Sequence, residues 1–530
     1  MDPTLDQHVD AGKNARLAWV AVIGLVLVLF RVPFYLTHHL QEDALILFRC
    51  AVNLADSGYY SFNVPHRDSA VTAHGYAFLV ALIRRLSGDR FIPVTVAVNT
   101  VFLVSGAYLA GAVLFGDFRR RVALWVVLSL LPVSLVTSYT GLETSMLVFL
   151  IALGLRGLVE ERTRVWSLAA LALLPWVRPD AIAFSGILAA GLSWKARRIH
   201  WPAVGSVALG AVTVAGFNYL YFGSLLNQTI IAKEVAYHPS RSVAAIAGRC
   251  WSVFFGNSFL VPLEVHRLER WSFVFGFPMV LLCIYSVIRS WPEAQRRVPI
   301  ACLAACALLV PLAYAYGGVI MFPWYFWPSA FFAWAVVLAM IVTWCAARSA
   351  GVCRWCWLGA VLVLGVLGAG QFCLSLNRGT QEHLYRTRVG TYIESRSSPG
   401  DTLFLEPAGY IPFYSKLYTY DEVGLGTPEI TDYRRNHPKD WWFQFLRDKR
   451  PTFLVERQHI LEFRTFEHYQ LTEEQIRWFR DHYQLIQEFH YDPADYFTHP
   501  LLRRVLELGS HHSYYVFELK SRIRKSTGPG

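Results

Sequence analysis

Long apolar runs, separated by short polar stretches, recur through the first 375 residues of the chain. Most of these runs approach the roughly 20 residues with which an α-helix crosses a bilayer. The pattern predicts about eleven membrane helices. They are expected at residues 16–36, 91–115, 122–140, 142–157, 165–177, 181–194, 202–222, 271–289, 298–317, 322–346 and 354–375. Two neighbouring runs, 165–177 and 181–194, are short and meet at an Arg-Pro-Asp corner.

The pattern changes near residue 376, after which charged residues are more frequent and apolar segments are short. Apolar positions four residues apart, at Tyr385, Val389 and Ile393, predict a helix, and the run 473–482 predicts another. Strands are expected at 402–405, 452–455, 485–489 and 514–519. We therefore expect a polytopic α-helical membrane protein with a transmembrane module, residues 1–376, and a C-terminal α/β domain, residues 377–530.

Basic residues between the apolar runs predict the orientation. The net charge is +11, although only 16% of the residues are charged and 54% are hydrophobic. Basic residues near span ends usually face the cytoplasm. Those near the predicted spans share one side if the N-terminus is cytoplasmic: Lys13, Arg16, Arg119, Arg120, Arg121, Lys195, Arg197, Arg198, Arg296, Arg297, Arg348 and Arg354. The C-terminal domain and two loops, residues 37–90 and 223–270, are then extracytoplasmic.

The N-terminal segment predicts an anchor in the membrane. The apolar run Leu17–Phe30 is followed by Arg31 and Pro33 without a small-residue cleavage site, as in an uncleaved signal anchor. Segment 71–87 is apolar enough to span, but a span there would place Arg119–Arg121 outside. We expect an interfacial or re-entrant helix, although the sequence leaves a span open. The sequence has no basic stripe with interleaved aromatic residues, so it does not predict a nucleic-acid partner.

Three carboxylates stand at expected ends of membrane helices: Glu42, Asp43 and Glu143. A carboxylate there can be a general base for a polar substrate. It can also be solvated, pair with Arg49 in the case of Asp43, or stabilise a helix N-terminus in the case of Glu143. Neighbouring helical positions point about 100° apart, so Glu42 and Asp43 cannot face one substrate equally.

Charged and aromatic residues at other expected span ends permit two interpretations each. Arg178 and Asp180 can form a mutual ion pair, or Arg178 can face a phosphate. Lys233 can bind a phosphate or be an ordinary surface residue. Trp324 and Tyr325 are typical of an interfacial aromatic belt, and they could also line a lipid groove or a sugar platform.

Several short motifs follow one another in a defined order. They are Glu42-Asp43-Ala44, Phe48-Arg49, Asn53-Leu54, Gly58, Phe62-Asn63, Gly75-Tyr76, Tyr139-Thr140-Gly141-Leu142-Glu143-Thr144, Val177-Arg178-Pro179-Asp180, Phe222-Gly223-Ser224-Leu225-Leu226-Asn227, Ala232-Lys233, Pro323-Trp324-Tyr325, Glu406-Pro407-Ala408-Gly409-Tyr410-Ile411-Pro412-Phe413-Tyr414 and Asp421-Glu422-Val423-Gly424-Leu425. This set resembles the GT-C superfamily of integral-membrane glycosyltransferases. It is most similar to terminal arabinofuranosyltransferases and related enzymes that use polyprenyl-phosphate sugars. Glu42-Asp43 departs from the Asp-Asp common in that family, and Asn227-Gln228-Thr229 departs from its Asn-Thr.

The resemblance implies a location in the bacterial inner membrane. It also implies transfer of a sugar, with inversion, from a polyprenyl-phosphate donor to an extracytoplasmic glycan, glycolipid or protein. It implies that Asp43 is the general base and that Glu143 positions the acceptor or a metal. Asp43 and Glu143 could together hold Mg²⁺ or Mn²⁺, which prefer oxygen ligands.

Other residues are expected to bind substrate. They are Glu42, Arg49, His74, Tyr76, Arg178, Asp180, Asn227, Lys233, Trp324 and Tyr325. In the C-terminal domain, Tyr410, Tyr414 and Asp421 could meet the acceptor or belong to a packed core. Two other classes of protein stay open: a transporter or flippase for lipid-linked sugars, and a non-enzymatic membrane scaffold with an external binding domain. The sequence does not identify the sugar, the acceptor or the oligomeric state.

Overall fold

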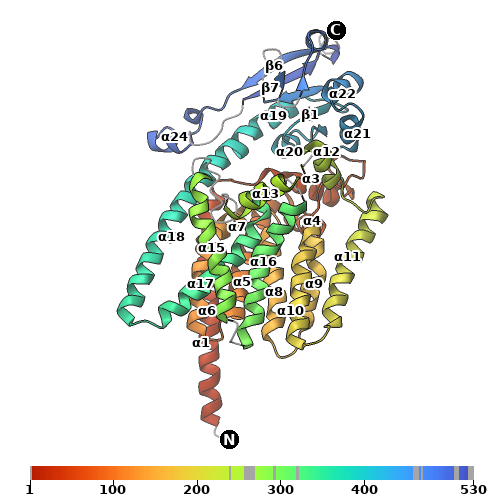
Figure 1. The fold of residues 1–530 in the computed structure, drawn as a ribbon. Helices are drawn as coiled ribbons and strands as arrows, with labels where there is room; N and C mark the ends of the chain where they lie inside the picture. The colour runs from red at the N-terminus through yellow and green to blue at the C-terminus, as the bar shows by residue number, and fades with distance from the viewer. Residues whose placement is uncertain are drawn as a thin grey trace.

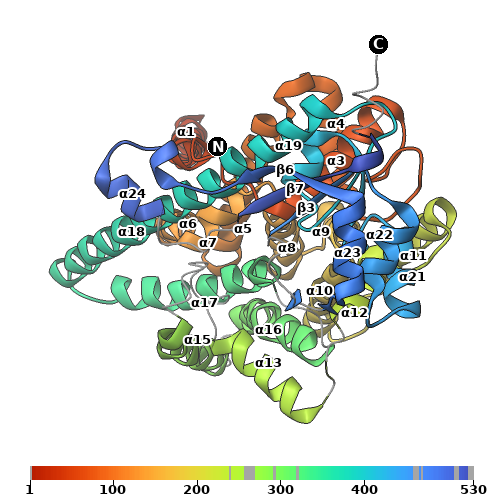
Figure 2. The ribbon, with the colours of Figure 1, turned by 90° about the horizontal axis from the view of Figure 1, so that it is seen from above.

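The computed structural model describes residues 3–237, 240, 242–255, 269–290, 294–317, 322–457, 465–466, 469–506 and 513–522. A bundle of helices forms one part, and a smaller domain built on a sheet covers one end of it (Figure 1). Seen from above, the sheet domain lies over α3, α4, α9 and α12 (Figure 2). Part of the external loop predicted at 223–270, residues 256–268, lies outside the described residues.

Helices account for nearly all of the first part. They are α1 (Pro3–Leu29), α2 (Val32–Tyr35), α3 (Glu42–Ser57), α4 (His74–Ser87), α5 (Phe91–Leu114), α6 (Phe118–Leu130), α7 (Pro132–Tyr139), α8 (Thr144–Val159), α9 (Val165–Val177), α10 (Ile182–Ala196), α11 (Trp201–Phe222), α12 (Gln228–Tyr237), α13 (Val243–Phe255), α15 (Glu269–Ser290), α16 (Ala294–Gly317), α17 (Trp327–Ala346) and α18 (Ala350–Arg378). Short 3₁₀ turns, η1 (Gly88–Arg90), η2 (Pro179–Ala181) and η3 (Pro323–Tyr325), join some of them.

Within the described residues, six helices are long and apolar enough to cross a membrane, or seven if the bent pair α6 and α7 forms one span. That pair bends by 65° at Pro132, which has no backbone N–H to continue the hydrogen-bond ladder. Helices α8 and α9 and the segment Pro278–Ser290 are apolar but shorter. The multi-pass membrane architecture is therefore confirmed, whereas the count of about eleven spans stays a prediction.

Segment 71–87, whose position the sequence left open, contains α4. Helices α4 and α5 make an apolar helical stretch of 41 residues, His74–Leu114. A straight span needs only about 20 residues. Figure 1 shows α4 beside α3, at the end of the bundle that faces the sheet domain. Its last turn carries Arg84, which pairs with Asp56 of α3 at 3.0 Å.

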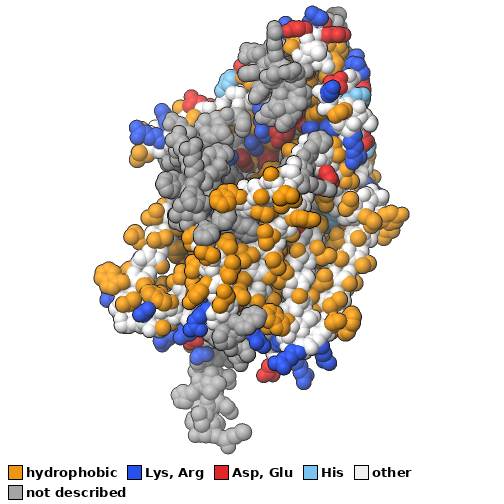
Figure 3. Space-filling view, viewed as in Figure 1, with side chains coloured by type: hydrophobic (Ala, Val, Ile, Leu, Met, Phe, Trp, Pro, Cys, Tyr) orange, Lys and Arg blue, Asp and Glu red, His pale blue; other side chains and the backbone are white. Residues whose placement is uncertain are grey.

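The outside of the bundle matches its apolar sequence. Figure 3 shows hydrophobic side chains covering the bundle in a broad band, with a group of Lys and Arg side chains at the end opposite the sheet domain. Acidic side chains are visible in a recess between the bundle and that domain (Figure 3).

The C-terminal domain is built on a five-stranded sheet with the order β2-β1-β3-β7-β6. Its strands are β1 (Thr402–Leu405), β2 (Tyr418–Asp421), β3 (Phe453–Glu456), β6 (Tyr483–Phe489) and β7 (Tyr514–Leu519). Strands β1, β2 and β3 are parallel, and β7 is antiparallel to its neighbours β3 and β6. A separate two-stranded sheet pairs β4 (Thr465–Phe466) with β5 (Tyr469–Gln470).

The C-terminal domain also contains helices. They are α19 (Arg386–Arg396), α20 (Tyr410–Ser415), α21 (Pro428–Asn436), α22 (Trp441–Lys449), α23 (Glu473–His482) and α24 (Pro500–Leu506). Residues of α21, α22 and α23 pack around Phe404 and Phe517 on one face, and those of α19 pack around Leu403 and Val455 on the other. The expected strands are present, so an α/β domain is confirmed. Strand β2, the sequence Tyr-Thr-Tyr-Asp, was not predicted because it is short and half polar.

Candidate active site

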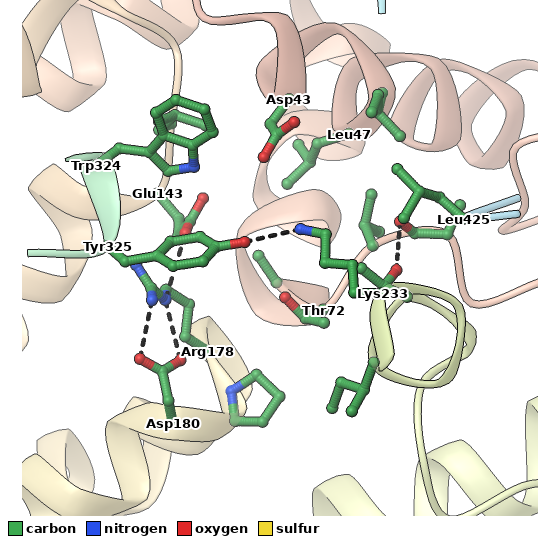
Figure 4. A pocket seen from close by; sticks show the side chains of 18 of the residues that line it. Asp43, Leu47, Thr72, Glu143, Arg178, Asp180, Lys233, Trp324, Tyr325 and Leu425 are labelled. Atoms are coloured by element: carbon green, nitrogen blue, oxygen red, sulfur yellow. Dashed lines mark hydrogen bonds and ion pairs between the residues drawn. The ribbon is translucent and has the colours of Figure 1, made fainter. Parts of the chain in front are cut away.

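A cavity of about 340 Å³ lies where the bundle meets the C-terminal domain. Seven of the predicted site residues line it: Asp43, Glu143, Arg178, Asp180, Lys233, Trp324 and Tyr325. They come from five separate segments, namely α3, the α7–α8 corner, the α9–α10 corner with η2, α12 and η3 (Figure 4). Leu425 of the C-terminal domain completes the wall. The fold therefore brings together side chains that are up to 382 residues apart, from Asp43 to Leu425.

Asp43 is the second residue of α3, where a carboxylate interacts favourably with the helix dipole. Burial raises the pKa of Asp43 above its ordinary value, and neighbouring Glu42 adds to the rise. Lys233, a hydrogen bond from Trp324 and Arg178 oppose this shift without cancelling it. Figure 4 shows the Asp43 carboxylate directed into the space between Trp324 and Lys233. A carboxylate in this position can accept a proton from a polar group bound in the cavity.

Glu143 lines the same cavity because the corner before α8 packs closely against α3. It precedes α8 at a corner that begins with Gly141, whose φ of +81° suits glycine. A Cβ on Gly141 would lie 3.1 Å from Ala44 and Phe48 of α3, so a larger residue would push the corner away. Burial raises the pKa of Glu143, although Arg178 opposes the shift.

Arg178 lies at the corner between α9 and α10 and is only 4% exposed. Its guanidinium donates to both carboxylate oxygens of Asp180, at 3.0 and 2.9 Å, and to the Tyr314 hydroxyl at 2.7 Å. It also lies 3.7 Å from Glu143 Oε1 and 5.1 Å from the centre of the Tyr325 ring. Its third nitrogen, Nη1, is buried and has no hydrogen-bond partner among the described residues. The Nε and Nη2 edge of the guanidinium is thus bonded to protein groups, while Nη1 is left to donate to a ligand.

Lys233 of α12 approaches from the opposite wall. Its ammonium donates to the Tyr325 hydroxyl at 2.7 Å and lies 5.3 Å from the centre of the Phe322 ring. Burial lowers its pKa, but Tyr325 and Asp43 outweigh burial and raise the pKa overall, so the ammonium stays charged. Figure 4 shows Tyr325 between Arg178 and Lys233. The two cations therefore face one space, which suits an anion.

The structure does not bring five of the expected substrate-binding residues into the cavity: Glu42, Arg49, His74, Tyr76 and Asn227. Each of them is hydrogen-bonded to other residues of the protein, and their contact with substrate stays a prediction. Tyr76 is buried, donates to Gly141 O at 2.9 Å, and so holds the corner before Glu143. His74 is buried 3.2 Å from the Asn227 amide at the start of α12, the helix that carries Lys233.

Glu42 and Arg49 connect α3 to the C-terminal domain. Glu42 Oε1 accepts hydrogen bonds from the N–H groups of Gly409, at 2.6 Å, and Tyr410, at 3.0 Å, while Glu42 Oε2 pairs with Arg386. The buried Arg49 donates to the carbonyls of Pro412 at 2.7 Å and Leu417 at 2.6 Å. The helix that bears Asp43 is therefore held by charge-assisted bonds on both sides of that residue.

The C-terminal residues expected near an acceptor are mostly internal. Tyr410 is buried against the bundle core, and Tyr414 packs on it as a partly buried neighbour. The buried Asp421 accepts hydrogen bonds from the N–H groups of Gly424, Leu425 and Gly426. Asp421 thus shapes the turn that presents Leu425 to the cavity.

The cavity residues that were not predicted as site residues include Leu425, Tyr314 and Thr229. Leu425 stands within a quoted motif, Asp-Glu-Val-Gly-Leu, which was the available signal. Tyr314 lies within the apolar run of α16 and carried no local signal.

The donor groups for a divalent ion are few. Among the described residues, no group of three or more His, Cys, Asp or Glu side chains is placed to hold a metal. Glu143, one of the two carboxylates expected to bind Mg²⁺ or Mn²⁺, pairs with Arg178. The described residues thus do not form a cage of protein ligands, and an ion held by Asp43 and Glu143 would depend on a substrate phosphate for further oxygen ligands.

Comparisons with known proteins agree with the architecture. The chain is similar to ArnT from Cupriavidus metallidurans bound to undecaprenyl phosphate, with a TM-score of 0.52, 12% identity, and coverage of 94% of this chain and 97% of that one. It is also similar to the apo state of the same protein, with a TM-score of 0.55, 12% identity, and coverage of 97% and 100%. At this identity the likeness concerns the fold.

Two further comparisons use the sequence. A family model described as a domain of unknown function, DUF8728, matches residues 376–516. No curated protein matches the chain. The ArnT structures therefore support the expected fold, whereas membership of the GT-C superfamily and the narrower likeness to arabinofuranosyltransferases stay predictions.

Proposed function

We propose that this protein is a membrane glycosyltransferase that moves a sugar from a polyprenyl-phosphate donor to an extracytoplasmic acceptor. The observation that carries the proposal is the cavity in which Asp43 faces Lys233 and Arg178. When a hydroxyl attacks a sugar phosphate, a carboxylate can take the proton of the hydroxyl and cations can stabilise the departing phosphate. The ArnT fold adds support, because one of the matching structures contains undecaprenyl phosphate.

The proposed reaction is a single displacement. The Asp43 carboxylate takes the proton of an acceptor hydroxyl as that oxygen attacks the anomeric carbon. The bond between this carbon and the phosphate oxygen breaks, and the lipid phosphate leaves with the electron pair. Because attack and departure occur on opposite faces, the anomeric configuration inverts.

The remaining cavity residues have supporting roles in this proposal. Arg178, through its unpaired Nη1, and Lys233 bind the phosphate and stabilise the charge that develops on it. Asp180 and Glu143 orient the guanidinium of Arg178. Trp324 supports Asp43 and offers an aromatic face to the sugar. No step in this scheme uses a metal.

We further propose that the cavity faces the extracytoplasmic side of the bacterial inner membrane. The group of Lys and Arg side chains at the opposite end of the bundle supports this orientation (Figure 3). Polyprenyl-phosphate arabinofuranose is the first donor to test, because the order of motifs most resembles that of terminal arabinofuranosyltransferases.

The test supplies purified protein in vesicles with a panel of polyprenyl-phosphate sugars and a cell-envelope extract as acceptor. The expected result is transfer from one donor, with a product of inverted anomeric configuration. Failure of every donor, a retained configuration, or movement of the lipid-linked sugar across the bilayer without transfer would contradict the proposal. The last outcome is the one that a flippase would give.

A further inference from the structure

The C-terminal domain has a second recess, with a volume of about 710 Å³. It lies at the edge strand β2, and its wall combines His66 of the first external loop with the segments 394, 397–402 and 415–418 and with Tyr420 and Glu429. None of these residues lines the cavity around Asp43. The recess is therefore a separate feature that the proposed reaction does not use.

Aromatic rings form one wall of this recess. Tyr418 and Tyr420 are two positions apart on β2, so their side chains lie on the same face of the strand. Their ring centres are 5.0 Å apart, and the ring of His66 lies 5.5 Å from that of Tyr418. Both tyrosines are half-buried, and within the described part of the chain no hydrogen bond involves their hydroxyls. The wall thus offers flat apolar surface with free polar tips.

The other walls are polar with an excess of acidic groups. They carry Glu394, Asp401 and Glu429, against a single lysine, Lys416, which pairs with Glu394 at 2.6 Å. Asp401 pairs with Arg522 at 2.7 Å, and Glu429 lies 3.7 Å from Lys449, so each carboxylate has a basic neighbour. A neutral molecule rich in hydroxyl groups would find carboxylate acceptors beside aromatic faces here.

Two short segments connect the recess to the cavity. Residue 66 lines the recess and residue 70 lines the cavity, so four Cα–Cα steps of about 3.8 Å bring the two sites within roughly 15 Å. The segment from Tyr420, which lines the recess, to Leu425, which lines the cavity, is a second short link between the two sites. The recess and the cavity are therefore neighbours in the fold, and residues of the C-terminal domain line both.

We propose that this recess binds a saccharide, namely the part of a glycan acceptor that lies next to the reacting hydroxyl. The role as an acceptor subsite rests on the proposed function, but saccharide binding itself does not. Tyr418 is the main stacking surface, and Glu429 accepts hydrogen bonds from sugar hydroxyls. The predicted ligand is neutral.

The experiment measures binding of short arabinan, galactan, mannan and chitin oligosaccharides to the full-length protein in nanodiscs by calorimetry. We expect one class to bind. Tyr418→Ala should weaken that binding about tenfold through loss of the stacking surface. Tyr418→Phe should retain most of the affinity because it keeps the ring, and Glu429→Gln should weaken binding severalfold. Tyr59→Ala, which changes an exposed tyrosine outside the recess, is the matched control.

Undecaprenyl phosphate binding, measured on the same samples, separates the two proposals. It should be unchanged in Tyr418→Ala, which also shows that the variant is folded. The saccharide proposal is overturned if no oligosaccharide binds, if Tyr418→Ala binds as tightly as the wild type, or if unglycosylated peptides occupy the recess instead. If saccharide binding depends on Tyr418 but undecaprenyl phosphate does not bind, the result supports the recess as a saccharide site and contradicts the proposed donor.

Discussion

The backbone N–H of Gly409 donates a hydrogen bond of 2.6 Å to the carboxylate of Glu42, the residue next to Asp43. A Cβ at position 409 would collide with the same carboxylate, so glycine permits the close approach. The C-terminal domain therefore contacts α3 at Glu42, one residue before the proposed base Asp43. The domain sets the position of α3 as well as covering the cavity.

This contact predicts that Glu42 affects turnover more than donor binding. In Glu42→Ala, the N–H groups of Gly409 and Tyr410 and the guanidinium of Arg386 lose their acceptor, and the start of α3 is released. We expect kcat to fall at least tenfold while undecaprenyl phosphate binds nearly normally. Glu42→Gln, which keeps one acceptor oxygen, should recover part of the activity. Equal losses in kcat and in lipid binding would show that Glu42 contacts the donor.

The two cations should determine the affinity for the donor phosphate. Hydrogen bonds to charged groups contribute about 1.5–3 kcal/mol, so Lys233→Met and Arg178→Lys should each weaken undecaprenyl phosphate binding roughly 10- to 100-fold. Arg178→Lys is not conservative, because lysine cannot keep both bonds to Asp180 and a bond to the ligand. Lys439→Met changes an exposed lysine and is the control. Unchanged Kd values in both cavity variants would place the phosphate elsewhere.

The pKa of Asp43 predicts the acidic limb of the pH–rate profile. Burial raises this pKa, and a base must be deprotonated, so activity should rise with pH through a value above the ordinary aspartate range. Lys233 lowers the pKa of Asp43, so removing it in Lys233→Met should move the limb to higher pH. The measurement is kcat against pH for both proteins. If the acidic limb of Lys233→Met stays in place or moves to lower pH, Asp43 is not the group whose deprotonation produces that limb.

Arg49 should stabilise the junction between the two parts of the protein. Arg49→Met removes the charged donor to the buried carbonyls of Phe62, Pro412 and Leu417, each of which keeps at least one weaker, uncharged donor. A hydrogen bond that involves a charged group contributes about 1.5–3 kcal/mol. We expect a lower Tm in detergent and faster proteolysis between α3 and the C-terminal domain. Similar Tm values and cleavage rates for the variant and the wild type would show that Arg49 is not needed there.

Much of this arrangement could be predicted from sequence because its signals are local. Apolar length identified the membrane helices, and carboxylates and cations at helix ends pointed to Asp43, Glu143, Arg178 and Lys233. The family resemblance then favoured Asp43 over Glu42. The structure agrees to the extent that Asp43 lines the cavity and Glu42 does not.

Other features depend on long-range packing and had no local signal. His74 and Tyr76 resemble site residues in sequence, yet each is buried and satisfies its polar atoms within the protein. Arg49 was expected at substrate but meets carbonyls more than 360 residues away in the chain. Such partners are known only when the C-terminal domain has been placed on α3.

The most direct test of the account is single-turnover sugar transfer by Asp43→Asn compared with wild type, once a donor has been identified. Asparagine has almost the same shape but cannot take the proton. The account predicts that donor binding is retained while transfer falls by about 10²- to 10⁴-fold. Asp56→Asn, on the exposed part of the same helix, should transfer normally. Transfer by Asp43→Asn at the rate of the wild type would contradict the account.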